Sequence, residues 1–127
     1  MIDIDLRAYL LSCDCISDLV STDIFALRLP QGRTTTAIVY DTGAGFPLAQ
    51  LGSLETVIKH NVTLSVYSPS YADMKTLTGH IVTELNGMSG PMGVSAVTSA
   101  HVESVLNTYE EELSLYRNII NLNIYTN

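Results

Sequence analysis

The chain has 127 residues, a length that fits a single domain spanning residues 1–127 with one buried core. Only 15% of the residues are charged and 46% are hydrophobic, so a monomer would leave much apolar surface in water, and we expect self-association. The net charge of −7, with no cluster of lysine and arginine, argues against sequence-specific binding of nucleic acid.

Location and redox state can also be predicted from the sequence. No apolar run approaches the roughly 20 residues that a membrane-spanning helix needs, and the first residues lack the basic start of a signal peptide. We therefore expect the protein to be made and kept in a cytoplasm. Cys13 and Cys15 are one residue apart, which is too tight for an ordinary disulfide and unlike the Cys-x-x-Cys of redox and zinc sites. We expect two free thiols.

The first half of the chain predicts one helix and three strands. Helical spacing of apolar residues runs from about Asp3, which can cap the free amides, to Ser12. Short strands are predicted at Ile24–Leu29 and at about Thr35–Tyr40. A long irregular loop with several glycines follows at Asp41–Ser53, and the alternation of Glu55–Tyr67 predicts a half-buried strand.

The second half predicts a capped helix and a hairpin. Ser70 and Asp73 have capping-box spacing, and Gly87 is a fitting stop after a helix whose apolar face comprises Met74, Leu77, Ile81 and Leu85. After a turn at Gly90–Gly93, two long strands are predicted at Ser95–Tyr109 and Leu113–Thr126. The sequence therefore predicts an α+β fold, in which an antiparallel or mixed sheet of about five strands has two helices packed on one face.

The segment Asp41-Thr42-Gly43-Ala44 follows an apolar run and matches the active-site loop of an aspartic protease. Such an enzyme needs two carboxylates that share a proton, and a small subunit obtains the second by dimerising. The capped helix in mid-chain disagrees with that class, whose members are almost wholly strand. Asp-Thr-Gly is equally a turn sequence after a strand, and we take Asp41 as a turn-forming carboxylate.

No other constellation predicts chemistry. His60, His80 and His101 have no second ligand at short spacing, so we expect no metal site. The sequence carries no phosphate-binding loop with its lysine and no nucleophile elbow. We expect no catalytic residues, no cofactor and no enzymatic activity.

The order of elements resembles the tail-terminator, or tail-completion, proteins of long-tailed bacteriophages. The resemblance rests on the short N-terminal helix followed by "IFALRLPQG" and "TTTAIVYD", then on "VTLSVYSPSYADMKTLTGHIVTELNG", and finally on "EEELSLYRNIINLNIYT". It spans nearly all 127 residues. The family's core, a sheet with helices on one side, agrees with the fold that periodicity predicts.

The resemblance implies a structural virion protein without chemistry. Its subunits would form a ring, typically a hexamer, that caps the tail tube, ends tube polymerisation and offers a surface for head-tail joining. The implied partners are other copies of the chain, the tail tube protein and a head-completion or connector protein, with DNA only passing through the lumen and no membrane. The implied location is the head-proximal end of the virion tail, and the host cytoplasm during assembly.

Two groups of residues are candidates for contacts in such a ring. Apolar residues of the glycine-containing loop would meet the tube or a neighbouring subunit: Phe46, Leu48 and Leu51. The alternative is a disordered surface loop. An acidic lumen would repel DNA during passage, with candidates Glu103, Glu110, Glu111 and Glu112 and the N-terminal Asp3 and Asp5. The alternative is that these carboxylates keep the subunit soluble.

Other functions stay open at this point. A head-completion or connector ring protein belongs to the same biology, although connectors more often show helical bundles or small barrels. Outside it, the alternatives are the dimeric protease built on Asp41-Thr42-Gly43 and a generic oligomeric binding module.

Overall fold

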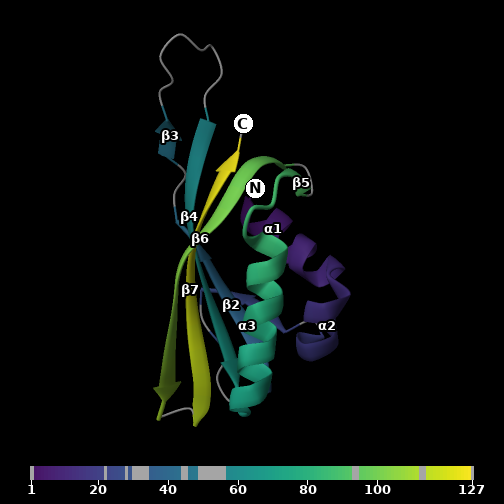
Figure 1. The fold of residues 1–127 in the computed structure, drawn as a ribbon, viewed down its shortest axis with the longest axis vertical. Helices are drawn as coiled ribbons and strands as arrows, with labels where there is room; N and C mark the ends of the chain where they lie inside the picture. The colour runs from purple at the N-terminus through teal and green to yellow at the C-terminus, as the bar shows by residue number, and fades with distance from the viewer. Residues whose placement is uncertain are drawn as a thin grey trace.

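The computed structural model describes residues 2–21, 23–27, 29, 35–43, 46–48, 57–92, 95–111 and 114–126. Three helices and seven strands are present among these residues, and the helices pack on one face of a single mixed sheet (Figure 1). The α+β class is as predicted. The sheet has more strands than the predicted five, and a third helix joins the two that were expected.

The first two helices are short and consecutive. Helix α1 spans Ile2–Ser12 and α2 spans Asp14–Val20, separated by Cys13 in an extended conformation. Since α1 already begins at Ile2, Asp3 lies within its first turn, and the prediction that Asp3 caps the helix is wrong. Helix α2 was not predicted; its buried residues Ile16 and Val20 are four apart and face the core.

Helix α3 spans Tyr71–Leu85 and agrees with the sequence pattern. The Ser70 hydroxyl accepts a hydrogen bond from the amide of Asp73 at 3.4 Å, which satisfies one free amide of the first turn. The predicted apolar face is buried, and it comprises Met74, Leu77, Ile81 and Leu85. Gly87 follows the helix with a φ of +80°, a conformation that glycine adopts without steric cost.

The sheet has the strand order β1-β2-β4-β7-β6-β5, with β3 pairing with β4 beside this path. The strands are β1 (Ile24–Ala26), β2 (Ala37–Thr42), β3 (Phe46–Leu48), β4 (Val57–Ser68), β5 (Gly90–Met92), β6 (Ser95–Glu110) and β7 (Leu115–Thr126). The pair β1 and β2 is parallel and the others are antiparallel. Strand β1 ends at Ala26, short of the predicted Leu29, and β5 occupies most of the predicted turn at Gly90–Gly93.

The predicted loop at Asp41–Ser53 is partly strand. Thr42 pairs with Val62, the Gly43 amide donates to the Asn61 carbonyl at 3.0 Å, and Phe46 pairs with Lys59. Strands β2 and β3 therefore lie one after the other along one edge of β4. Asp41 belongs to β2, so its prediction as a turn residue is wrong. Residues 44–45 and 49–53 of the predicted loop lie outside the described residues.

One core fills the space between the sheet and the helices. Alternate residues of β4 and β7 face the helices and are buried, as their periodicity predicted; they are Val62, Leu64, Val66, Ile120, Leu122 and Ile124. Leu6, Leu10 and the apolar face of α3 close this core from the helix side. The opposite face of the sheet, which no described helix covers, is called the helix-free face below.

Candidate interaction surfaces

The helix-free face carries a network of polar side chains across three strands. Thr63 of β4 donates to the Asn121 amide oxygen of β7 at 3.1 Å, and Asn121 donates to the Ser104 hydroxyl of β6 at 3.1 Å. Asn123 of β7 donates to the carboxylate of Glu103 on β6. These bonds tie the rows of the sheet together and give this face a fixed, hydrophilic surface.

Arg117 is the centre of this network near the β6–β7 turn. Its guanidinium forms an ion pair with Glu110 at 2.9 Å and donates two hydrogen bonds to the Ser65 hydroxyl, at 3.0 and 3.4 Å. It also lies over the ring of Tyr67, 5.4 Å from its centroid. The arginine charge is therefore compensated within the subunit.

A small apolar cluster lies beneath this arginine on the same face. Val39, Tyr67 and Leu115 are buried there, and Phe25 and Leu29 pack against them. The helix-free face is thus apolar where β1, β2 and the start of β7 meet and mostly polar along the rest of β4, β6 and β7, with Leu106 of β6 as an exposed apolar exception.

The predicted acidic residues occupy different environments. Glu103 and Glu110 lie on the helix-free face, each with the partner given above. Glu111 is exposed at the β6–β7 turn, and Glu112 lies outside the described residues. Asp5 in α1 is buried, so a place for it on a lumen wall is wrong; the side chain of Asp3 lies outside the described part of the chain.

Three exposed apolar residues lie along the end of β6. Val105, Leu106 and Tyr109, called the β6 strip, are 44%, 59% and 48% exposed. Tyr109 contacts Tyr116 of β7, with ring centroids 5.0 Å apart, and Tyr116 contacts the exposed Tyr71 of α3 at 5.5 Å. Val105 and Tyr109 lie with these two tyrosines on the side of the sheet that faces the helices, whereas Leu106 lies on the helix-free face.

The outer edge of β6 is open beside this strip. Only Ser95–Val97 pair with β5, and near Ala100 and Val102 the edge is met by the Gly87 amide and the Asn86 side chain. From Ser104 to Glu110, no described strand pairs with that edge. Exposed strand edges offer unpaired amides and carbonyls to another chain.

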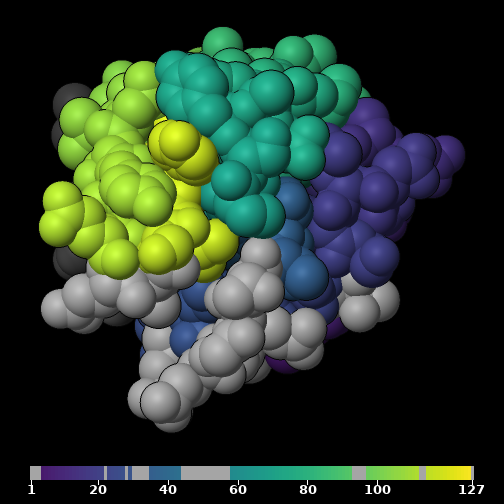
Figure 2. All heavy atoms as spheres, turned by 90° about the horizontal axis from the view of Figure 1, so that it is seen from below, coloured from purple at the N-terminus to yellow at the C-terminus, as the bar shows by residue number. Residues whose placement is uncertain are grey.

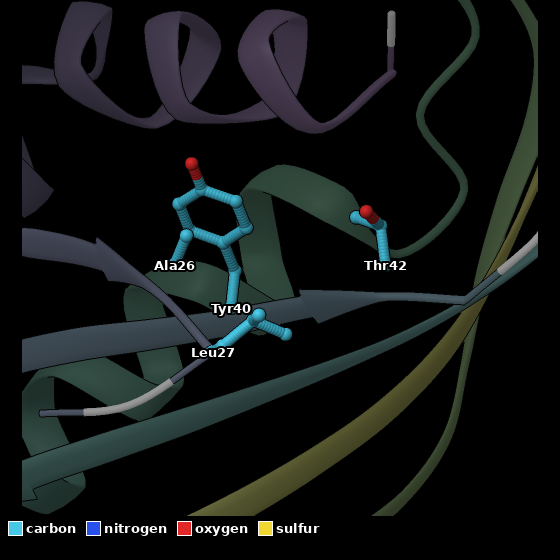
Figure 3. A pocket seen from close by; sticks show the side chains of 4 residues that line it. All are labelled: Ala26, Leu27, Tyr40 and Thr42. Carbon is cyan, nitrogen blue, oxygen red and sulfur yellow. The ribbon is translucent and has the colours of Figure 1, made fainter.

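A pocket lies near the opposite edge of the sheet, where β1 ends beside β2. It has a volume of about 220 Å³ and is lined by Ala26, Leu27, Tyr40 and Thr42. Tyr40 and Thr42 rise from β2 toward the helix above the sheet, and Ala26 and Leu27 stand at the end of β1 (Figure 3). None of the four side chains is charged.

Leu27 at the rim of this pocket is held in an unfavourable state. Its side chain is 73% exposed, the largest value among the exposed large hydrophobic residues of the described chain. Its backbone has a φ of +68°, a region that costs an L-residue with a Cβ roughly 1 kcal/mol. The amide of Leu27 donates to the Tyr40 carbonyl at 2.8 Å and fixes this turn beside β2.

The other predicted site residues that the structure describes lie in β2 and β3. Asp41 is exposed within β2 and pairs with Thr63, whereas the catalytic loop of an aspartic protease presents its carboxylate from a tight turn. The backbones of Phe46 and Leu48 pair with β4 in β3. Leu51 lies outside the described residues. Strand β3, which contains Phe46 and Leu48, pairs with the first residues of β4 and lies far from the β6–β7 turn (Figure 1).

The histidines and cysteines do not gather into a site. Among the described residues, no group of three histidine, cysteine, aspartate or glutamate side chains could hold a metal ion. Both cysteines are free thiols, as predicted. Burial and the nearby Glu84 carboxylate raise the pKa of the Cys13 thiol to about 11, and burial lowers the pKa of His60.

Sequence reasoning missed the β6 strip and the pocket. One feature of the sequence could have indicated the strip: Val105 and Leu106 are adjacent apolar residues that break the alternation of a half-buried strand. In the structure, they follow a register shift between Val102 and Ser104. The pocket had no signal, since "IFALRL" alternates like an ordinary strand and gives no hint of the turn at Leu27.

Comparison with known proteins shows the fold. No protein-family model matches the chain, and no curated protein matches its sequence. One similar solved structure is a chain of the "Virion of native gene transfer agent (GTA) particle", with a TM-score of 0.69 and 15% identity. The likeness covers 95% of this chain and 93% of that chain, so the two share one fold from end to end. None of the described helices is both long and apolar enough to span a bilayer.

Proposed function

We propose that this chain is a structural virion protein that forms a ring, caps a phage tail tube, ends its polymerisation and presents a surface for head-tail joining. The observation that carries the proposal is the likeness in fold, over 95% of the chain, to a component of a virion particle. The sequence resemblance to tail-terminator proteins over nearly the same span supports the finer assignment.

The surface chemistry of the subunit is consistent with a ring. A closed ring needs two different surfaces on each subunit that fit each other. The described chain has apolar surface near opposite edges of its sheet, at the β6 strip and at Leu27. A chain with only 15% charged residues can bury such surfaces without removing many charges from water.

The proposed role involves binding without chemistry. The partners would be further copies of the chain, in a hexamer or a ring of similar size, together with the tail tube protein and a head-completion or connector protein. No cofactor or metal is required. The protein would act at the head-proximal end of the tail after assembly in the host cytoplasm.

The end of the subunit that carries β3 is proposed as the tube contact. Phe46, Leu48 and Leu51 belong to the segment that joins β2 to β4, and β3 lies at the far end of the molecule from the β6–β7 turn (Figure 1). Deleting Phe46–Leu51 should then abolish capping. Tails of normal length assembled with this deletion would refute the contact.

The helix-free face is proposed as the wall of the lumen. Glu103 and Glu110 lie on it beside amides and hydroxyls, and the Arg117 charge is compensated by Glu110. Such a wall gives DNA phosphates little to bind. Glu111 and Glu112 at the turn would add negative charge at its rim; their alternative role is solubility.

The direct test mixes the protein with subunits of the tail tube protein of the same virus and images the product by negative-stain electron microscopy. We expect rings on one end of each tube and tubes that are shorter than those formed without the protein. Tubes of unchanged length with bare ends would overturn the proposal. Binding to isolated connectors without any effect on tubes would favour the head-completion alternative.

A further inference from the structure

Two apolar surfaces of the described chain lie near opposite edges of one sheet. The β6 strip belongs to β6, near one edge of the sheet. The pocket with Leu27 lies beside β1 and β2, at the other end of the strand order. Seen from the end, β6 and the N-terminal helices occupy opposite sides, with α3 between them (Figure 2). Two unlike surfaces placed in this way suit head-to-tail association of identical subunits.

The surfaces also match in size and charge. An apolar cavity of about 150 Å³ can hold a benzene molecule, so the pocket of about 220 Å³ has room for a tyrosine ring. Val105 and Tyr109 project from the side of β6 that faces the helices, as Tyr40 and Thr42 do from β2. The pocket lining and the β6 strip carry no charged side chain, and the Lys75 ammonium beside the strip is already bound to the Asn107 side-chain oxygen at 3.0 Å.

Leu27 gives an independent reason to expect a partner at the pocket. A glycine at this position would relieve the backbone strain and remove the exposed apolar surface, yet the chain carries leucine at a φ of +68°. Strained residues of this kind are concentrated at sites that clamp a ligand or partner. The cost to the isolated subunit is explained if the leucine side chain is buried on assembly.

We infer that the β6 strip of one copy docks on the pocket of a second copy, with Tyr109 entering between Leu27 and Tyr40. The open edge of β6 from Ser104 to Glu110 would then lie beside the β1–β2 edge of its neighbour, where the Arg7 side chain already donates to the Ile24 carbonyl. The inference rests on the proposed ring and names the two surfaces that build it.

The test uses one variant on each surface, Tyr109→Asp and Leu27→Asp, with Thr76→Asp on the exposed side of α3 as a matched control. Circular dichroism first establishes that each variant is folded, and light scattering after size exclusion gives its mass. We expect oligomers for the wild type and the control and monomers for both surface variants. An equimolar mixture of the two variants should form dimers, because one intact strip and one intact pocket remain.

A third variant separates association from folding. Leu27→Gly should keep or raise the midpoint of thermal unfolding while it weakens self-association at least tenfold. Wild-type mass in either aspartate variant, a mixture that stays monomeric, or a wild-type protein that is monomeric at every concentration would overturn the inference. Tube capping by a Tyr109→Asp protein would overturn the inference alone. Variants that associate as expected, combined with a wild-type protein that leaves the tubes bare, would overturn the proposed function alone.

Discussion

At the scale of single residues, the Cys13 thiol and the His60 imidazole both have pKa values shifted by burial. Cys13 separates α1 from α2, where its thiol donates to the Tyr9 carbonyl at 3.4 Å and to Glu84 at 3.8 Å. His60 of β4 shares a hydrogen bond of 3.1 Å with Thr126 at the end of β7. Both side chains serve packing between elements, and each gives a prediction that tests the local structure.

Cys13 should react slowly with alkylating reagents. With a pKa of about 11, the thiol carries on the order of 100-fold less thiolate near pH 8 than an ordinary cysteine of pKa 9.0. In a Cys15→Ser background, we expect Glu84→Gln to accelerate alkylation by iodoacetamide, since it removes the carboxylate that opposes ionisation. Mass spectrometry of timed samples gives the rates. Equal rates for the two proteins would mean that Glu84 has no influence on the thiol.

His60 should make folding sensitive to mild acid. Because burial lowers its folded-state pKa below the usual 6.5, the unfolded chain takes up a proton first as the pH falls through that value. Stability from neutral His60 is therefore complete above about pH 6.5 and declines below it, until the folded-state pKa is reached. Urea unfolding over this range should show a smaller pH dependence for His60→Gln than for the wild type. An identical dependence would assign the acid sensitivity to other groups.

At the scale of elements, α3 is anchored on β7 by one buried polar pair. The Asn118 side-chain amide donates to the Thr78 hydroxyl at 2.7 Å, and Asn118 is fully buried. The Asn118 amide oxygen has no hydrogen-bond partner among the described atoms. A directional bond of this kind fixes how the helix lies along the strand, at the cost of one unsatisfied acceptor.

Removing one partner of this pair should cost more than removing both. Thr78→Val leaves a buried amide without an acceptor, which we expect to lower the free energy of unfolding by about 1–3 kcal/mol. The double variant Thr78→Val/Asn118→Leu also removes the unsatisfied oxygen and should be at least as stable as Thr78→Val alone. Urea unfolding of both singles and the double gives the coupling energy. Additive losses would show that the pair does not act as a unit.

The elements that sequence reasoning found are those with strong local signals. The cap at Ser70 and the apolar spacing of α3 are contained within one segment, and so is the acidic turn between β6 and β7. Asp41 shows the opposite case, because its turn preference is outweighed by pairing with Thr63 in the ladder of β2 and β4. The parallel pair β1–β2 and the three-residue β5 depend on contacts distant in sequence and leave no periodicity to detect.

At the scale of the whole molecule, the fold was more predictable than the surfaces. Alternation along β4 and β7 identifies the core because burial on one face leaves a period of two in the sequence. The pocket beside Leu27 arises only when β1 stops and the chain turns with a positive φ next to Tyr40, which composition cannot reveal. The acidic excess was visible in the sequence, but the pairing of Glu110 with Arg117 was not.

The net charge of the whole molecule predicts how assembly responds to salt. Each subunit carries a net charge of −7, so copies that approach one another repel, while the β6 strip and the pocket lining contain no charged side chain. Added salt shortens the screening length from about 10 Å at 0.1 M to about 3 Å at 1 M, which weakens the repulsion and leaves the apolar contact intact.

Self-association of the wild type should therefore strengthen as sodium chloride is raised, with light scattering at constant protein concentration as the measurement. The Tyr109→Asp protein is the matched control, and it should stay monomeric across the series because screening cannot restore the lost apolar contact. Assembly that weakens as salt is added would indicate a subunit interface stabilised by ion pairs. Such an interface would involve the few lysines and arginines of the chain, and the surfaces at β6 and Leu27 would then face other partners.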